Sequence, residues 1–353
     1  MAGLDRSLPA GTTRVPTRGW NEYTQLSRQL KQAGLLGRRR GWYGARIGLN
    51  LGLLAAGGVG FFLLGESWWQ LLTAVYLAIV ATQLAFVGHD AGHRQIFRSR
   101  HANDLVGLLN GNLLVGISFG WWVPKHNAHH TNPNDEDLDP DIGIAALAFT
   151  AAQARGKRGL ARVIARSQAF LFFPLLLLEA GHLHVASMKS ILGGRGRANT
   201  LEGLLLLVHA VVYVTALVVV LTPLQGVAFA LVQQGLFGLY LGCSFAPNHK
   251  GMPTLTEADE LDFLRRQVLT SRNVRGSRVV DFLLGGLNYQ IEHHLFPNMP
   301  RPNLRHAQPL VKAFCRQHQL PYAEASLFGS YAEALRHLHA VGAPLRPVRT
   351  AAD

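Results

Sequence analysis

The chain has 353 residues and a formal net charge of +13, which at first suggests an anionic partner. However, only 16% of the residues are charged and 48% are hydrophobic, whereas soluble domains carry about 25% charged residues. The composition therefore argues against a nucleic-acid-binding protein and against a disordered chain. Two cysteines are too few for a disulfide-rich secreted domain. A membrane protein fits the composition best.

The chain begins with a segment predicted to be a flexible tail, residues 1–20, followed by a short amphipathic helix at 21–36. Two uncharged runs come next, separated only by Glu66, and residues 203–249 contain no Asp, Glu, Lys or Arg. A helix needs about 20 apolar residues to cross a bilayer, so the last run is long enough for two spans. We predict four transmembrane helices, near 47–65, 67–88, 203–222 and 225–245.

Two further apolar runs, 105–124 and 167–178, are flanked by basic residues on both sides. Basic residues mark the cytoplasmic side of a membrane, so a segment with basic residues at both ends is not expected to cross. We predict that both runs form interfacial or re-entrant helices. The first of them also holds Asn110, Asn112 and four glycines.

The basic residues also predict the topology. All 34 Lys and Arg residues lie in 1–46, 89–202 and 250–353, and none lies in the two short loops between paired spans. Both termini and both long polar regions are therefore expected in the cytoplasm. We divide the chain into a cytoplasmic amino-terminal tail with the amphipathic helix (1–40), a membrane domain (41–310) and a cytoplasmic tail (311–353). Helices are predicted near 303–318 and 329–341.

Eight of the sixteen histidines form three tight groups and one singleton on the predicted cytoplasmic side. Within a group, residues four apart share one face of a helix. Imidazole suits iron, zinc and copper, and eight imidazoles are too many for one ion but enough for two six-coordinate ions. The predicted metal ligands are His89, His93, His126, His129, His130, His249, His293 and His294. His184 is kept as a possible outside ligand, and His209 is expected to hydrogen-bond between helices.

The motifs HDAGH, HNAHH and QIEHHLFP, in this order, resemble the three histidine boxes of the integral-membrane fatty acid desaturase family. The resemblance covers about residues 60–310. It implies an all-α membrane fold of four transmembrane helices with a cytoplasmic helical cap that holds a non-haem di-iron centre. The implied iron ligands are the seven histidines of the boxes, with His249 as the histidine that follows the last span. Gln290 stands where the commoner third box has histidine, which resembles the front-end desaturases.

The resemblance also implies the reaction: O2 and two electrons introduce a cis double bond into a fatty acyl chain, carried as acyl-CoA or in a lipid. No flavin, NAD or haem motif is present, so ferredoxin or cytochrome b5 with its NAD(P)H reductase is the implied electron donor. Side chains beside the boxes are expected to orient the imidazoles. These candidates are Asp90, Asn127, Asp139, Gln290 and Glu292. Trp121 and Trp122 are candidates for lining an acyl tunnel.

Three alternatives remain open at this point. HDAGH is close to the HExxH motif of zinc proteases, but Asp90 replaces the glutamate that acts as general base. The same metal site could serve a lipid or alkane hydroxylase or ketolase. A metal transporter or sensor would instead carry ionisable residues inside its spans, where only His209 qualifies. The excess of Arg over Lys suggests a GC-rich bacterial source and hence the plasma membrane.

Overall fold

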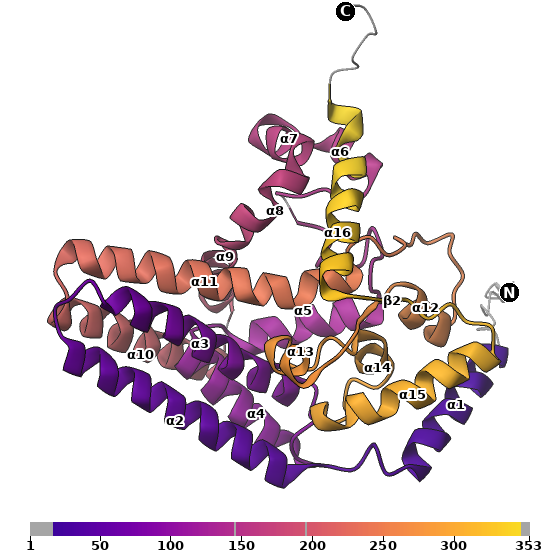
Figure 1. Ribbon diagram of the computed structural model, residues 1–353, viewed down its shortest axis with the longest axis horizontal. Helices are drawn as coiled ribbons and strands as arrows, with labels where there is room; N and C mark the ends of the chain where they lie inside the picture. Colours follow the sequence, from indigo (N-terminus) through magenta and orange to yellow (C-terminus); the bar gives the residue numbers. More distant parts are fainter. Residues whose placement is uncertain (1–16, 145, 195, 347–353) are drawn as a thin grey trace, which may run out of the picture.

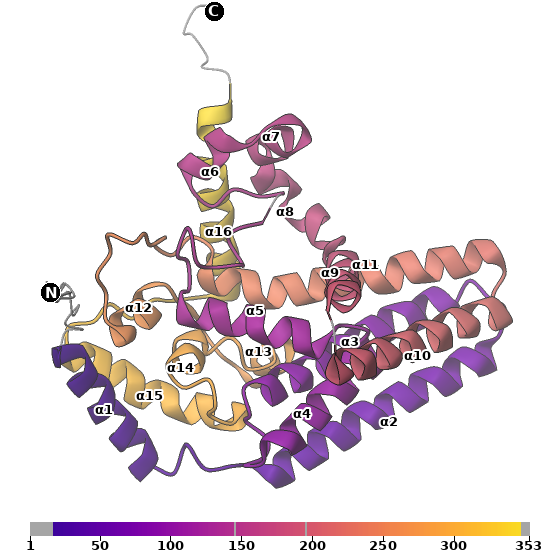
Figure 2. The same cartoon turned by 180° about the vertical axis from the view of Figure 1, so that it is seen from behind.

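A computed structural model describes residues 17–346 except 145 and 195. The predictions for residues 1–16 and 347–353, at the two ends of the chain, lie outside the described residues. The predicted amphipathic helix is present but spans Thr17–Gln32 rather than 21–36, so residues 17–20 are helical and do not belong to a flexible tail. The chain is almost entirely helical, and Figures 1 and 2 show it from opposite sides. The division into three regions at residues 40 and 310 stays a prediction.

Four helices are long and apolar enough to cross a membrane, and they extend together toward the left of Figure 1. The predicted number of transmembrane helices is therefore confirmed. The four helices pair as two hairpins with short connections, as the uncharged runs predicted. They are α2 (Arg40–Leu64), α3 (Gln70–Gly92), α10 (Arg197–Val220) and α11 (Pro223–His249).

All four helices run past the predicted limits of the spans at the end where the histidines lie. Helix α3 continues four residues beyond 88, and α11 continues to His249 rather than ending at 245. Absence of charge marks the part of a helix that lies in hydrocarbon, whereas the backbone hydrogen bonds of a helix do not stop at the membrane surface. These extensions carry the first histidine group and His249.

The two ambiguous apolar runs are bent, as predicted for segments that do not cross. The first comprises α4 (Arg100–Leu108), the π-helix η1 (Leu109–Val115) and α5 (Phe119–Thr131), with a bend of 112° before α5. The second comprises α7 (Gly159–Arg166) and α8 (Gln168–Leu176), bent by 107°. Counting each bent pair as one span would give six spans, but bends this sharp prevent either pair from running straight through a bilayer.

The bend before α5 is held by Glu202 of α10. One carboxylate oxygen of Glu202 accepts hydrogen bonds from the Asn112 amide (3.0 Å), the Ser118 hydroxyl (2.7 Å) and the backbone N–H of Gly120 (3.0 Å). A β-carbon at position 120 would lie 2.0 Å from the other carboxylate oxygen, so a larger residue there would push the Glu202 carboxylate out of this position. Helix α5, which carries the second histidine group, is thus anchored to a transmembrane helix.

The remaining elements are short and gather at the ends of α3 and α11 (Figure 1). A two-residue parallel pair, β1 (Asn273–Val274) and β2 (Glu324–Ala325), is the strand pairing of the described part. The other elements are α1 (Thr17–Gln32), α6 (Ala151–Gly156), α9 (Glu179–Gly193), α12 (Phe263–Leu269), α13 (Arg278–Leu283), α14 (Gln290–Leu295), α15 (Arg301–Gln317), α16 (Leu327–Val341) and the 3-10 helix η2 (Ala343–Leu345).

The short helices have a hydrophobic core of their own, outside the transmembrane bundle. Leu26 and Leu30 of α1 pack with Ile291 of α14 and with Leu304 and Phe314 of α15, and all five are fully or almost fully buried. Helix α14 carries the third histidine group. Its position is therefore fixed by apolar packing, which is the dominant stabilising term in folding.

Arg272 is buried at the junction of α11, α16 and the loop before β1, and it should be essential for stability. Its guanidinium donates to the carbonyl oxygens of Pro247 (2.7 Å) and Lys250 (2.9 Å) and pairs with Glu333. Arg272→Met would leave the two buried carbonyl oxygens without their donor, at a cost of about 1–3 kcal/mol for each unsatisfied group. We expect a clearly lower midpoint of heat unfolding in detergent, and little change for the exposed control Arg336→Met. Equal midpoints for the two variants would contradict this role.

Candidate metal centre

Four elements bring the eight predicted histidines into one region of the cap. The elements are the end of α3, the second half of α5, the last residue of α11, and α14. Seven of the eight side chains are buried, and His126 is half-buried. The eight histidines therefore form a single polar cluster inside the protein.

The ring nitrogens divide into two groups that could each hold an ion. In the first group, one nitrogen each from His89, His93, His126 and His293 lies within 4.8 Å of all the others. The second group consists of His129, His249 and His294, by the same criterion. His130 lies between the groups: its Nε2 is 3.1 Å from Nε2 of His126, and its ring stacks on His294 at 4.1 Å between centroids.

The spacing of the nitrogens fits metal binding. Nε2 of His89 is 3.2 Å from Nε2 of His126, and Nε2 of His249 is 3.3 Å from that of His129 and 3.1 Å from that of His294. Two nitrogens at right angles, each about 2.1 Å from one ion, lie about 3 Å apart. The cluster thus has the nitrogen separations of a ligand set.

Buried ring nitrogens without a hydrogen-bond partner are a second indication that the cluster fits a metal ion. Within residues 17–346, apart from 145 and 195, the buried Nε2 atoms of His93 and His293 have no hydrogen-bond partner. Buried polar atoms without a partner are costly, and a metal ion would satisfy these two. The buried histidine clusters are therefore able to bind metal.

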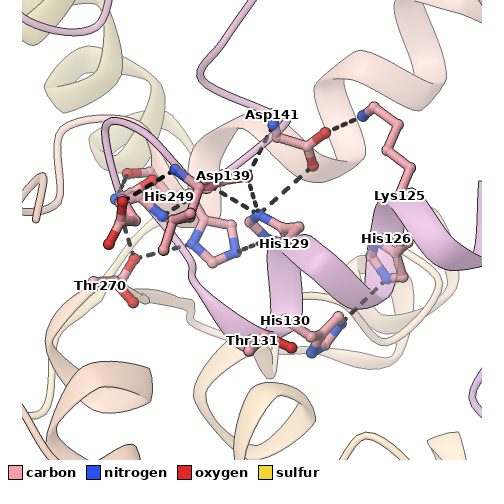
Figure 3. Close-up of polar contacts among 12 residues, drawn as sticks. Lys125, His126, His129, His130, Thr131, Asp139, Asp141, His249 and Thr270 are labelled. Atoms are coloured by element: carbon pink, nitrogen blue, oxygen red, sulfur yellow. Dashed lines mark hydrogen bonds and ion pairs between the residues drawn. The ribbon is translucent and has the colours of Figure 1, made fainter. Parts of the chain in front are cut away.

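The outward-facing Nδ1 atoms are held by acceptors, which leaves Nε2 pointing into the cluster. Figure 3 shows two of these contacts: Nδ1 of His129 donates to Asp139 at 3.0 Å, and Nδ1 of His249 donates to the carbonyl oxygen of Thr270 at 2.9 Å. Nδ1 of His294 donates to Oε1 of Gln267 at 2.9 Å. Such outer partners fix the tautomer and orientation of a ligating imidazole.

Asp90 makes a similar contact in the first group and is itself held by a buried network. Its carboxylate lies 3.3 Å from Nδ1 of His89, accepts a hydrogen bond from the hydroxyl of Tyr43 at 3.1 Å, and pairs with Arg301 at 2.6 Å. Arg301 is the first residue of α15, so this ion pair links α3 to the carboxyl-terminal part of the chain. The predicted orienting contact of Asp90 is present.

The electrostatics favour the neutral imidazole, the form that binds metal. Burial, and then the neighbouring histidines, lower the pKa of His93, His293 and His294 well below its usual range. Burial alone would raise the pKa of Asp139, but the pKa is lowered, chiefly by the hydrogen bond that the carboxylate accepts from His129. Asp139 is thus ionised beside His129 at neutral pH.

Asp141 adds a third acidic group that the sequence reasoning did not single out. Its carboxylate lies 3.7 Å from Nδ1 of His129 and pairs with Lys125, as Figure 3 shows. His129, Asp139 and Asp141 also satisfy the distance criterion for a metal group. Asp139 and Asp141 belong to the loop that directly follows α5, which explains why both reach the same histidine.

The remaining predicted neighbours differ in their contacts. Gln290 lies beside the second group, with Nε2 2.8 Å from Nε2 of His249. Glu292 faces away from the histidines and accepts hydrogen bonds from Asn273 and from the hydroxyl of Tyr322, both at 2.7 Å. Burial raises the pKa of Glu292 to about 7. Asn127 lies on the exposed face of α5, so the expected orienting role has no basis in its position.

His184 and His209 lie apart from the cluster. His184 donates to the carbonyl oxygen of Gly116 at 2.8 Å, and its other nitrogen is 3.0 Å from the side chain of Gln234. His209 donates to the carbonyl oxygen of Leu113 at 2.9 Å. Both therefore hydrogen-bond between helices, as expected for His209, and His249 rather than His184 lies in the second group.

Sequence reasoning missed Thr270, Gln267 and Arg301. Thr270 contributes only a backbone oxygen, and any residue could supply one, so no sequence signal exists. Gln267 belongs to no motif and reaches His294 because α12 packs beside α14. Arg301 lies a few residues after the third box. Asp90 belongs to a motif predicted to be buried, and a buried carboxylate needs a cationic partner, so the sequence did contain a signal for Arg301.

A cavity of about 490 Å³ adjoins the histidines. Five of the histidines line it, together with apolar side chains such as Val115, Leu183, Leu241 and Phe245. Trp122 also lines it and stacks on His126 at 4.3 Å between ring centroids. Trp121 is not among the lining residues and packs in the adjoining apolar core, so only one of the two predicted tunnel residues faces the cavity.

Comparison with known proteins gives an independent result. The family model described as "Fatty acid desaturase" matches residues 66–326, which is well over half of the chain. An acyl-lipid (9-3)-desaturase from Physcomitrium patens is 33% identical over 284 residues, covering 77% of this chain. Delta(8)-fatty-acid desaturases from Helianthus annuus and Borago officinalis are 28% and 30% identical, each over 90% of the chain.

The aligned region spans about half (53%) of the moss protein and 72% and 74% of the two plant proteins. The family match extends from the connection between the first two spans to residue 326, past the third histidine box and α15. It therefore includes every histidine of both metal-binding groups. The chain therefore belongs to the fatty acid desaturase family.

Proposed function

We propose that the chain introduces a cis double bond into a fatty acyl chain, using O2 and two electrons from an external donor. The observation that carries this proposal is the lining of the larger cavity. This cavity, of about 490 Å³, is lined by apolar side chains and also by five of the eight histidines. Ligand pockets usually measure about 300–1,000 Å³ and are mostly apolar. An acyl chain in this cavity would have its carbon–hydrogen bonds next to the metal-binding groups.

The ligand assignment follows the two groups. His89, His93, His126 and His293 would hold one iron ion, His129, His249 and His294 would hold the other, and His130 lies between them. Bound iron would supply the oxidising power, with O2, that removes two hydrogens from an unactivated chain, which no side chain can do. The protein binds the chain, excludes water through the apolar lining, and keeps the imidazoles neutral and oriented.

Charged side chains at the cavity favour a substrate that has a charged group at one end. Lys125, Asp141 and Lys250 line it together with the histidines. An acyl chain carried on coenzyme A or in a phospholipid has such an end, and the names of the relatives favour fatty acyl substrates. Electrons would come from ferredoxin or from cytochrome b5 with its NAD(P)H reductase. The donor would bind at the cytoplasmic face of the protein, which we place in the plasma membrane.

The proposed reaction can be tested by its product. The chain would be expressed in a host of defined lipid composition, and fatty acid methyl esters would be analysed by gas chromatography. We expect a new unsaturated fatty acid, which disappears on His129→Ala. A hydroxylated fatty acid in its place, or no lipid change although the protein carries its full metal content, would contradict desaturation.

The size of the cavity should limit the length of the acyl chain. Val115 lines the cavity at the end of η1 and is 4% exposed, so Val115→Trp would fill part of the space. We expect the products to shift toward shorter chains, at a stability cost of about 1–3 kcal/mol for overpacking. The control is Val211→Trp, the same change on the exposed face of α10 (54% exposed). An identical product profile for both variants would show that the cavity does not select chain length.

A further inference from the structure

A second cavity, of about 230 Å³, is lined by Arg301, the partner of Asp90, and by none of the eight histidines, and it plays no part in the proposed reaction. It is formed by the start of α2, by α13 and by the start of α15. Four arginines line it, with Trp42, Phe282 and Tyr289 as aromatic walls and Asp281 as the one lining carboxylate. The arginines are Arg46, Arg278, Arg301 and Arg305.

Among the described residues, two of these guanidinium groups keep N–H donors that the protein does not satisfy. Arg301 is only 6% exposed, and its Nε is a buried donor without a partner in the described residues. Arg46 makes no hydrogen bond or ion pair within 17–346, leaving out 145 and 195; its guanidinium lies over the rings of Trp42 (5.4 Å) and Phe282 (5.3 Å). Arg305 alone pairs with the pocket's acid, Asp281, at 3.3 Å. Arg301 also pairs with Asp90 through its Nη2 atom, so the donors left for a further anion are the Nε of Arg301 and the guanidinium of Arg46.

The position of the pocket indicates where the anion comes from. Arg46 is the last charged residue before the uncharged run of the first span. Helix α13 leaves Val279 and Leu283 exposed, at 65% and 41%, beside the pocket. Apolar side chains and a tryptophan next to arginines are typical of the membrane surface, and basic pockets at the ends of transmembrane helices bind anionic lipid headgroups.

We propose that this pocket binds the phosphate group of an anionic phospholipid such as phosphatidylglycerol. Arginine suits phosphate because its planar N–H donors match phosphate oxygens in pairs. Gly286 makes room for the anchor of the site: its φ is +79°, and a β-carbon there would lie 2.6 Å from Cγ of Arg301. A bound phosphate would bridge α2, α13 and α15 and reinforce Arg301, which holds Asp90 beside His89.

Native mass spectrometry of the metal-loaded protein, offered equal amounts of phosphatidylglycerol and phosphatidylcholine in detergent, tests this site. We expect one tightly retained phosphatidylglycerol in the unmodified protein. The double variant Arg46→Gln and Arg305→Gln should lose the preference, by about fivefold for each arginine removed. The control Arg100→Gln and Arg336→Gln removes the same charge from exposed positions outside the pocket and should keep it.

Equal preference in the two double variants, or no preference for phosphatidylglycerol in the unmodified protein, would overturn the proposal. A third arm adds inorganic phosphate: complete displacement of the lipid at low millimolar phosphate would assign the pocket to free phosphate instead. Metal content reports whether the pocket variant is folded. If it is not, Arg278→Gln replaces an exposed lining residue, and an unchanged lipid preference in that variant would equally count against the site.

Discussion

His93→Ala and His249→Ala should each abolish desaturation and each remove one metal ion per chain. The two histidines belong to different nitrogen groups, and each is buried. Loss of an outer partner of a metal ligand already costs about 10–100-fold in affinity or activity, and loss of a ligand should cost more. Metal content by plasma emission spectroscopy and product by gas chromatography would be measured on the same purified samples.

The matched control for these variants is His101→Ala. His101 is exposed on α4, close in sequence to the first histidine group but outside both nitrogen groups. It should retain full activity and full metal content. Retention of both ions by either ligand variant would show that the nitrogen groups do not correspond to separate ions. Loss of both ions from a single substitution would mean that the two ions bind as one unit.

Asp139→Asn should lower activity by about 10–100-fold while leaving the fold intact. The carboxylate accepts from Nδ1 of His129 with both oxygens at 3.0 Å and also accepts the backbone N–H groups of Asn134 and Asp141, both at 2.8 Å. The amide keeps the size of the side chain but removes the charge that orients His129. We therefore expect weaker metal binding, measured by the chelator concentration that removes half of the iron.

Asp137→Asn provides the control, because it makes the same change two residues away at an exposed position of the same loop. It should behave like the unmodified protein. If the two variants lost iron at the same chelator concentration, the contact between Asp139 and His129 would not contribute to the metal centre.

The fold was predictable to the extent that it depends on the membrane. Runs without charge located the four long helices, and basic residues on both sides of 105–124 and 167–178 indicated that these segments do not cross. The ends of the helices were not predictable in this way, since His249 lies within α11 although the apolar pattern ends earlier. The thickness of the hydrocarbon layer determines how many consecutive residues must be apolar. The full length of a helix also depends on its packing beyond that layer.

The histidines of the centre were predictable because they come in tight groups, but most of their partners were not. Asp90 and Asp139 directly contact histidines and are close to them in sequence. Gln267 and Thr270 arrive from a segment more than twenty residues away, which only the tertiary packing of α12 against α14 brings near. Asn127 is adjacent to a box yet exposed, because a helix turns neighbouring residues to different faces.

The metal content of the purified, unmodified chain tests the central claim most directly. The cluster offers eight imidazoles in two groups linked by His130, and imidazole binds iron and zinc alike, so only measurement identifies the ion and its number. The expected result is two iron ions per chain by elemental analysis of protein expressed with sufficient iron. A single zinc ion per chain, with no iron, would contradict it.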